Sequence, residues 1–325
     1  MQNVKWPELL VLSIVLIAHV ATVQAQQQKI PRVGILFIGS RNQPHLDAFK
    51  QGLRERGYTE GQNIALEYRY AEGKEDRLAA LAAELVHLNS DVIVTTAGTS
   101  ARAVQQATKK IPIVLTTGDP VASGLADSLA KPGGNVTGLT VLLADLSGKR
   151  LDILKETFPT ATRVAALWNP TEKIGVSAFQ QTKAAAQAMS LQLASLEVHT
   201  PADIEEVFTD ISKKRSNALL VMLSPLTMLN SKRIVELAIK HRLPGMYPTR
   251  QFAEEGGLMA YGPNIDDLYR RAATYVDKIL KGVKPADLPV EQPTKFDFVI
   301  NLKTAKQISF AIPPNVLVRA DKVIK

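Results

Sequence analysis

The 325-residue sequence contains no cysteine. Disulfide bonds, thiolate nucleophiles, thiolate metal sites and iron–sulfur clusters are therefore excluded, as is a lipid-modified cysteine at a processed N-terminus. Hydrophobic residues make up 46% of the chain and charged residues 22%. This composition is typical of a globular protein that buries its own core, and the length suits two lobes of ordinary size.

Concentrated positive charge is also lacking. The 39 Lys and Arg residues exceed the 31 Asp and Glu residues and give a net charge of +8, yet the longest basic run is only Lys213, Lys214 and Arg215. Proteins that bind DNA or RNA usually gather basic residues on one face or carry a reader motif. We therefore expect no nucleic-acid partner.

Motifs of catalysis are absent from the sequence as well. His45, His87, His199 and His241 are far apart, and none has the HExxH spacing of a zinc site. The chain has no GxSxG nucleophile motif and no GxxxxGK[ST] phosphate loop. We expect no metal, no cofactor and no enzymatic activity. A secreted α/β enzyme that uses Asp119 or a histidine as its base stays open as an alternative.

Long hydrophobic runs are scarce, and the one we single out lies near the N-terminus. Residues 9–18 (LLVLSIVLIA) follow Lys5 and precede the small residues Val23 and Ala25. This three-part pattern predicts a signal peptide over residues 1–25 with cleavage after Ala25. The run is short for a membrane span of about 20 residues, although an uncleaved anchor is the alternative.

Short apolar runs rich in β-branched residues alternate with amphipathic helical segments along the rest of the chain. Continuous runs of this kind indicate strands that are covered on both faces, as in a parallel sheet. The pattern breaks at Pro132–Asn135 and then restarts. The sequence therefore predicts an α/β protein of two lobes, each a mostly parallel sheet flanked by helices. Strands are predicted at 33–38, 64–70, 91–95, 111–115, 136–141, 163–168, 191–198, 218–223, 257–261 and 296–301.

Small and polar residues gather where these predicted strands end. In open α/β sheets, ligands bind outside the carboxyl ends of the strands, where helix N-termini present free N–H groups. Gly98, Thr99 and Ser100 combine a close backbone approach with two hydroxyl donors, which suits an anion such as a carboxylate. The candidate ligand-binding residues are Ser40, Thr96, Gly98, Thr99, Ser100, Gly118, Asp119, Asn169, Ser224, Tyr247 and Tyr261.

Each of these residue types also has an ordinary structural role. Thr99 and Ser100 are common helix N-caps, while Asp119 before Pro120 is typical of a turn as well as of an ammonium partner. Asn169 forms turns as readily as it contacts ligands. Aromatic side chains near strand ends, such as Tyr247 and Tyr261, more often pack than stack on a ligand.

Several stretches together resemble the substrate-binding family of ABC transporters that includes tryptophan-type binding proteins. These stretches cover nearly the whole chain after the predicted signal, and as a set they are far more distinctive than a single glycine motif. They are LDAFKQGL (46–53), GYTEGQNI (57–64), EYRYAEG (67–73), GDPV (118–121), KPGGNVTG (131–138) and FVINLKTAKQISFAIPP (298–314).

The resemblance implies a periplasmic-binding-protein-like fold of type I, in which two lobes joined by several hinge crossovers close on a small molecule. It implies delivery of that ligand to an ABC permease in the inner membrane, and an amino acid or related carboxylate as the ligand. Without a lipid-anchoring cysteine, the implied form is free in the periplasm, and we expect it to be a monomer. The implied carboxylate contacts are Thr96, Thr99 and Ser100, and the other implied contacts are Ser40, Asp119, Asn169 and Tyr261.

We expect residues 30–139 and 260–284 to form the N-terminal lobe. Residues 140–259 and 285–325 are then expected to form the C-terminal lobe. A ligand-sensing ectodomain with the same cleft, held by an uncleaved N-terminal anchor, is a further alternative.

Overall fold

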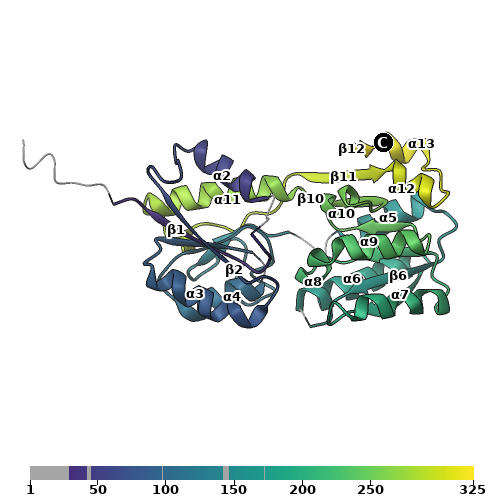
Figure 1. Ribbon diagram of the computed structural model, residues 1–325, viewed down its shortest axis with the longest axis horizontal. Coiled ribbons are helices and arrows are strands. Elements are labelled where there is room, and N and C mark those ends of the chain that lie inside the picture. Colours follow the sequence, from purple (N-terminus) through teal and green to yellow (C-terminus); the bar gives the residue numbers. More distant parts are fainter. Residues whose placement is uncertain (1–28, 42–44, 97, 142–145, 172) are drawn as a thin grey trace, which may run out of the picture.

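The computed structural model describes residues 29–41, 45–96, 98–141, 146–171 and 173–325. They form two lobes that lie side by side (Figure 1). The predicted signal peptide at 1–25 lies outside the described residues. Within the described part of the chain, every helix is too short or too polar to cross a bilayer.

The first lobe is built on a five-stranded parallel sheet with the order β2-β1-β3-β4-β5. Its strands are β1 (Arg32–Phe37), β2 (Ala65–Tyr70), β3 (Val92–Thr95), β4 (Ile113–Leu115) and β5 (Val136–Gly138). Its helices are α2 (His45–Arg54), η1 (Glu75–Arg77), α3 (Leu78–His87), α4 (Gly98–Ala107), α11 (Ile265–Leu280) and η2 (Pro285–Asp287).

Alternating side chains along β1 explain how both faces of this sheet are covered. Val33, Ile35 and Phe37 pack in the core beneath α2 and α11. Leu36 and Ile38 point to the opposite face and pack against α3 and α4. Figure 1 shows α2 and α11 above the sheet and α3 and α4 below it. The strands are thus buried from both sides, as the continuous apolar runs predict.

The second lobe has a seven-stranded sheet with the order β12-β11-β10-β9-β8-β6-β7. All neighbouring strands are parallel except β10 and β11, which are antiparallel. Its strands are β6 (Arg163–Trp168), β7 (Gln192–Glu197), β8 (Ala218–Val221), β9 (Gly245–Tyr247), β10 (Met259–Pro263), β11 (Phe296–Asn301) and β12 (Lys322–Ile324).

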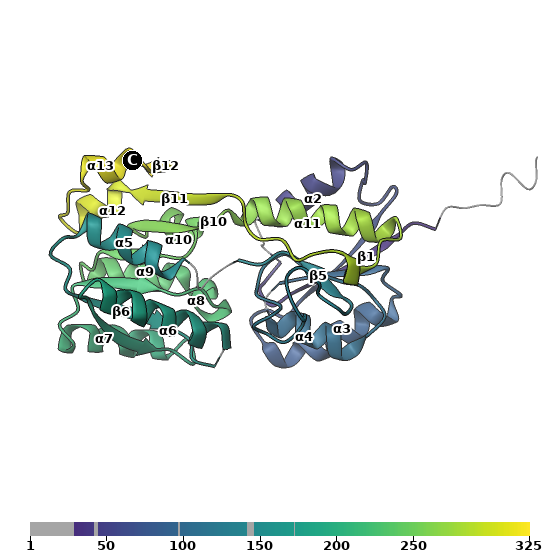
Figure 2. The ribbon, with the colours of Figure 1, turned by 180° about the vertical axis from the view of Figure 1, so that it is seen from behind.

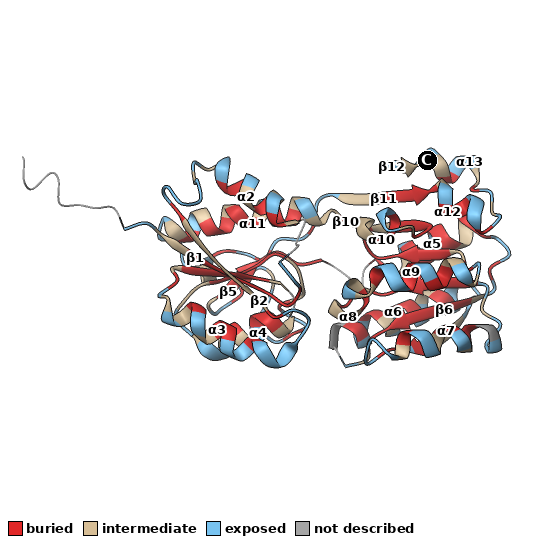
Figure 3. Ribbon diagram, in the orientation of Figure 1, coloured by how far each residue is buried: buried red, intermediate tan, exposed pale blue. Residues whose placement is uncertain are grey.

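Helices cover both faces of this sheet too, and Figure 3 shows their outer surfaces exposed and the strands between them buried. One core lies beneath α5 and α13, and the other beneath α7, α9 and α10. The helices are α5 (Ser147–Thr157), α6 (Lys173–Ala188), α7 (Asp203–Lys213), α8 (Pro225–Leu229), α9 (Ser231–Lys240), α10 (Arg250–Glu254), α12 (Leu302–Gln307) and α13 (Pro314–Leu317). The predicted fold class, two mostly parallel sheets flanked by helices, is confirmed.

The chain passes between the lobes three times, and all three places differ from the predicted boundaries. Residues 260–263 were expected in the first lobe, but they belong to β10, which pairs with β9 and β11 in the second sheet. Residues 285–291 were expected in the second lobe, but the N–H groups of Val290 and Glu291 donate to Leu129 and Gly138 of the first. The part of the first lobe that lies late in the sequence therefore runs from α11 to Glu291. Residue 140 also lies with the first lobe, since its N–H donates to the Glu291 carbonyl.

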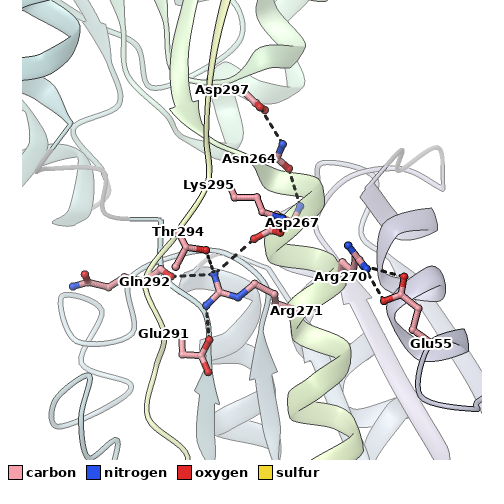
Figure 4. Close-up of polar contacts among 10 residues, drawn as sticks. All are labelled: Glu55, Asn264, Asp267, Arg270, Arg271, Glu291, Gln292, Thr294, Lys295 and Asp297. Atoms are coloured by element: carbon pink, nitrogen blue, oxygen red, sulfur yellow. Dashed lines mark hydrogen bonds and ion pairs between the residues drawn. The ribbon is translucent and has the colours of Figure 1, made fainter. Parts of the chain in front are cut away.

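Two of the crossings are tied to the start of α11 by polar contacts (Figure 4). The Arg271 guanidinium pairs with the Glu291 carboxylate and donates to the Gln292 carbonyl at 3.1 Å. Lys295 pairs with Asp267 at 2.8 Å. Asn264 caps α11 through the Asp267 N–H and donates to Asp297 of β11 at 3.0 Å. Figure 2, which shows the molecule from behind, follows β11 into this connection beside α11.

Candidate ligand-binding site

A cavity of about 640 Å³ lies between the lobes, where strands of both sheets end. Its first-lobe wall consists of Phe37, Ile38, Gly39, Ser40, His45, Thr96, Gly98, Thr117, Gly118, Val141, Ile265 and Tyr269. Its second-lobe wall consists of Leu223, Ser224, Pro225, Met228, Leu229, Asn230, Ser231, Lys232, Arg233, Glu236, Thr249, Gln251 and Glu255. The volume is in the range of small-molecule pockets, which is about 300–1,000 Å³.

Aromatic rings form one part of the first-lobe wall. The rings of Phe37 and Tyr269 are stacked with centroids 6.2 Å apart, and the His45 ring lies 5.4 Å from that of Tyr269. Phe37 stacks in turn on Tyr70 of β2. Burial raises the pKa of the Tyr269 phenol, so its ring stays neutral across the physiological range. Phe37 is 2% and Tyr269 4% exposed, so the two rings belong to the core of the first lobe and also border the cavity.

A polar part of the same wall lies at the next strand end. Thr96 follows β3 and Gly98 begins the ten-residue helix α4, whose first N–H groups have no partners within the helix. The neighbouring hydroxyls of Thr99 and Ser100 are buried, and neither has a hydrogen-bond partner among the described residues. These two residues do not line the cavity. They directly follow Gly98, which does, in the first turn of α4. An anion at this helix N-terminus would meet partial positive charge.

The second-lobe wall combines apolar and charged side chains. Ser224 caps α8, because its hydroxyl accepts the Thr227 N–H at 3.1 Å. Leu229, at the end of that helix, is 50% exposed although it is large and apolar. Arg233 of α9 pairs with Glu205 and Glu236. Within the described part of the chain, acidic and histidine side chains do not gather in groups of three or more that would suit a metal ion.

The remaining predicted site residues lie outside the cavity lining and have structural partners. Asp119 accepts the N–H groups of Val121 and Ala122, and Asn169 accepts from the N–H and hydroxyl of Thr171. Both residues thus form turns, which is the ordinary structural role that the sequence analysis gave for them.

The two predicted tyrosines likewise pack within the second lobe. Tyr247 is 1% exposed and stacks on Phe252 in the core. The Tyr261 ring lies parallel to Phe296 and edge-on to Phe298. Ser40, Thr96, Gly98, Gly118 and Ser224 are therefore the predicted residues that the fold brings together around the cavity.

Sequence reasoning did not single out His45 and Tyr269. His45 is the first residue of α2, and Tyr269 lies in α11, more than 200 residues later. The two helices pack side by side over the first sheet, which brings both rings to the cavity. A local signal for His45 is weak, since it lies at the start of an amphipathic helix, whereas Tyr269 sits among the core positions of α11.

Comparison with known proteins agrees with this architecture. A family model described as ABC transporter substrate binding protein matches residues 40–324. The solved structure of a conserved domain protein from Vibrio cholerae is 30% identical, with a TM-score of 0.85 over 91% of this chain and 100% of that chain. The structure of an ABC domain from Streptococcus pneumonia in complex with L-Trp is 27% identical, with a TM-score of 0.83 over 90% of this chain and 99% of that one.

A third relative is named for its ligand. The tyrosine-binding protein of Clostridioides difficile is 27% identical over 273 residues, which is 82% of this chain and 77% of that protein. The family and these ligand-binding relatives are solute-binding proteins rather than enzymes. The family model spans nearly all of the two-lobed fold, and the chain therefore belongs to the ABC transporter substrate-binding protein family.

Proposed function

We propose that this chain captures an aromatic amino acid between its lobes for an ABC importer. The observation that carries the proposal is the stacked pair of Phe37 and Tyr269 in the cavity wall, next to the N-terminus of α4. The relatives that are solved with L-Trp or named for tyrosine support the same ligand class.

The spacing of the strand ends suits such a ligand. Phe37 ends β1, and Thr96 follows β3, which is the neighbour of β1 in the sheet. Neighbouring strands lie about 4.8 Å apart, so a ring that stacks on Phe37 and Tyr269 leaves its carboxylate within reach of Thr96 and Gly98. Glu236 and Glu255 line the opposite wall, where Glu236 pairs with Arg233 and Glu255 accepts a hydrogen bond from Gln251. We propose these carboxylates as the partners of the ligand ammonium.

Capture between two lobes explains how ligand binding would lead to transport. The bound state places the ligand between both walls, and a ligand that contacts both walls favours the closed arrangement of the lobes by the difference in its affinity for the two states. The closed form then delivers the amino acid to a permease in the inner membrane. The chain acts as a monomer in the periplasm, after removal of residues 1–25.

Isothermal titration calorimetry of the protein without residues 1–25 tests the ligand class directly. We expect saturable binding of L-Trp, L-Tyr or L-Phe, and at least about tenfold weaker binding of L-Leu, L-Glu and glucose, which lack an aromatic ring to stack. Calorimetry is preferable to intrinsic fluorescence because Trp168 stacks on Phe179 rather than lining the cavity. Binding of the aliphatic or acidic compounds in preference to all three aromatic ones would contradict the proposal.

The Thr96→Ala variant should weaken aromatic amino acid binding by about tenfold, because it removes a hydroxyl at the proposed carboxylate position. The double variant T99A/S100A, which removes two hydroxyls behind the cavity lining, should weaken binding by less than about threefold in the same titration. A larger loss in T99A/S100A than in T96A would place the carboxylate at Thr99 and Ser100, the anchor that the sequence predicts.

A further inference from the structure

His45 forms a hydrogen bond that fixes which of its ring nitrogens carries a hydrogen. Its Nδ1 lies 2.7 Å from Oδ1 of Asp266, in the first turn of α11. The hydrogen bond from His45 holds the pKa of the Asp266 carboxyl below its ordinary value, so this group is a carboxylate at neutral pH. A carboxylate only accepts hydrogen bonds, and Nδ1 must therefore be the donor.

The other ring nitrogen of His45 is consequently an acceptor. In a neutral imidazole, one nitrogen carries the hydrogen and the other carries a lone pair. With the hydrogen on Nδ1, the lone pair is on Nε2. The His45 side chain lines the cavity, and its ring lies 5.4 Å from Tyr269 at an interplanar angle of 43°. An acceptor thus stands beside the ring on which the ligand is proposed to stack.

We infer that Nε2 of His45 accepts a hydrogen bond from the side chain of the bound aromatic amino acid, and that the site therefore prefers tryptophan and tyrosine to phenylalanine. This inference rests on the proposed function, since it names a selective contact within the same cavity. The donor is the indole N–H of tryptophan or the phenol O–H of tyrosine.

The physical reason for selectivity is the cost of an unmade hydrogen bond. A ligand ring that stacks on Tyr269 presents its edge to the tilted His45 ring, and water around Nε2 is displaced when the ligand fills the cavity. Tryptophan and tyrosine replace that water with their own donor, whereas phenylalanine leaves the acceptor without a partner. Asp266 is a positioning residue here, because it holds the His45 ring in one tautomer and orientation.

The test compares L-Trp, L-Tyr and L-Phe by calorimetry at about pH 8. We expect the wild-type protein to bind the better of tryptophan and tyrosine at least about tenfold more tightly than phenylalanine. His45→Phe keeps a ring beside Tyr269 but removes both nitrogens. In H45F, the affinity for phenylalanine should change by less than about threefold, while that for the preferred ligand should fall to nearly the same value.

Two further variants serve as controls: His45→Gln retains an acceptor, and His241→Phe removes a histidine outside the cavity. The glutamine carbonyl is an acceptor, so H45Q should keep part of the preference that H45F loses. His241 also lies beside an aromatic ring, with its centroid 5.8 Å from that of Phe208, but it does not line the cavity. H241F should therefore bind all three amino acids as the wild type does.

The outcomes separate the two proposals. If the three aromatic amino acids bind the wild type with equal affinity, or if H45F loses affinity for all three alike, the role of His45 is overturned and the proposed function stands. If none of the three binds, the proposed function fails, and the role of His45 falls with it. If H45F keeps the preference for a ligand that donates a hydrogen bond, the acceptor is another group and the assignment to His45 is wrong.

Discussion

Replacing Tyr269 by alanine is expected to weaken aromatic amino acid binding by about 100-fold, from the loss of ring stacking together with apolar contact area. The Tyr269 ring is the link between the Phe37 ring and the His45 ring, at 6.2 Å and 5.4 Å respectively. Its removal opens the aromatic wall on the α11 side. Calorimetry with the tightest-binding amino acid measures the change, at a temperature where thermal unfolding shows the variant to be folded.

Tyr261→Ala is the matched control. Tyr261 is one of the two tyrosines that the sequence analysis assigned to the site, but its ring packs against Phe296 and Phe298 outside the cavity lining. Y261A should change affinity by less than about threefold, although it weakens the second lobe. Tyr269→Phe should bind nearly as well as the wild type, since it retains the ring. Equal losses in Y269A and Y261A would argue against the aromatic wall as the ligand contact.

Replacing Gly262 by alanine is expected to lower the free energy of unfolding by about 3 kcal/mol, because a side chain is forced into a packed region. A Cβ atom at this position would lie 1.9 Å from the Pro248 carbonyl oxygen and 3.4 Å from the Arg150 guanidinium. The obstacle is backbone rather than a flexible side chain, so β9 and β10 would have to separate. Arg150 donates from Nε to the Tyr261 carbonyl at 2.8 Å and would be displaced with them.

Denaturant unfolding of G262A measures the loss, and Gly134→Ala provides the comparison. A Cβ atom at Gly134 would meet no heavy atom within 4 Å, so G134A should differ from the wild type by less than about 0.5 kcal/mol. Similar stabilities for G262A and the wild type would mean that the strand ends separate without cost. We also expect G262A to bind ligand more weakly, since Gly262 is three residues before the first residue of α11.

The fold could be predicted because ten of the twelve strands among the described residues are recognisable from their own residues, whereas β9 and β12, of three residues each, were not predicted. The run at Val33–Ile38 has the apolar character of a strand covered on both faces, and α2 and α11 on one side and α3 and α4 on the other supply that cover. The lobe to which a strand at a crossing belongs cannot be predicted in the same way. Residues 260–263 join the second sheet through pairing with β9 and β11, and no local pattern encodes those partners.

The site was predictable where backbone position alone decides it. Thr96 and Gly98 follow strand β3, and the rule that ligands bind at strand ends finds them. It does not show which way a side chain turns, so Tyr247 was assigned to the site although its ring stacks on Phe252 in the core. Tyr269 was missed for the opposite reason, because its position in α11 resembles that of core residues such as Leu268 and Ala272.

The contacts that bind residues 291–295 and Asn264 to the start of α11 limit the freedom of the joint. Arg271 keeps the third crossing against the helix, and the Asn264 amide links the second crossing to Asp297 of the third. The second and third crossings are thus joined to each other as well as to α11. We therefore expect a closure of the proposed kind to pivot near the start of α11, where the second and third crossings are joined.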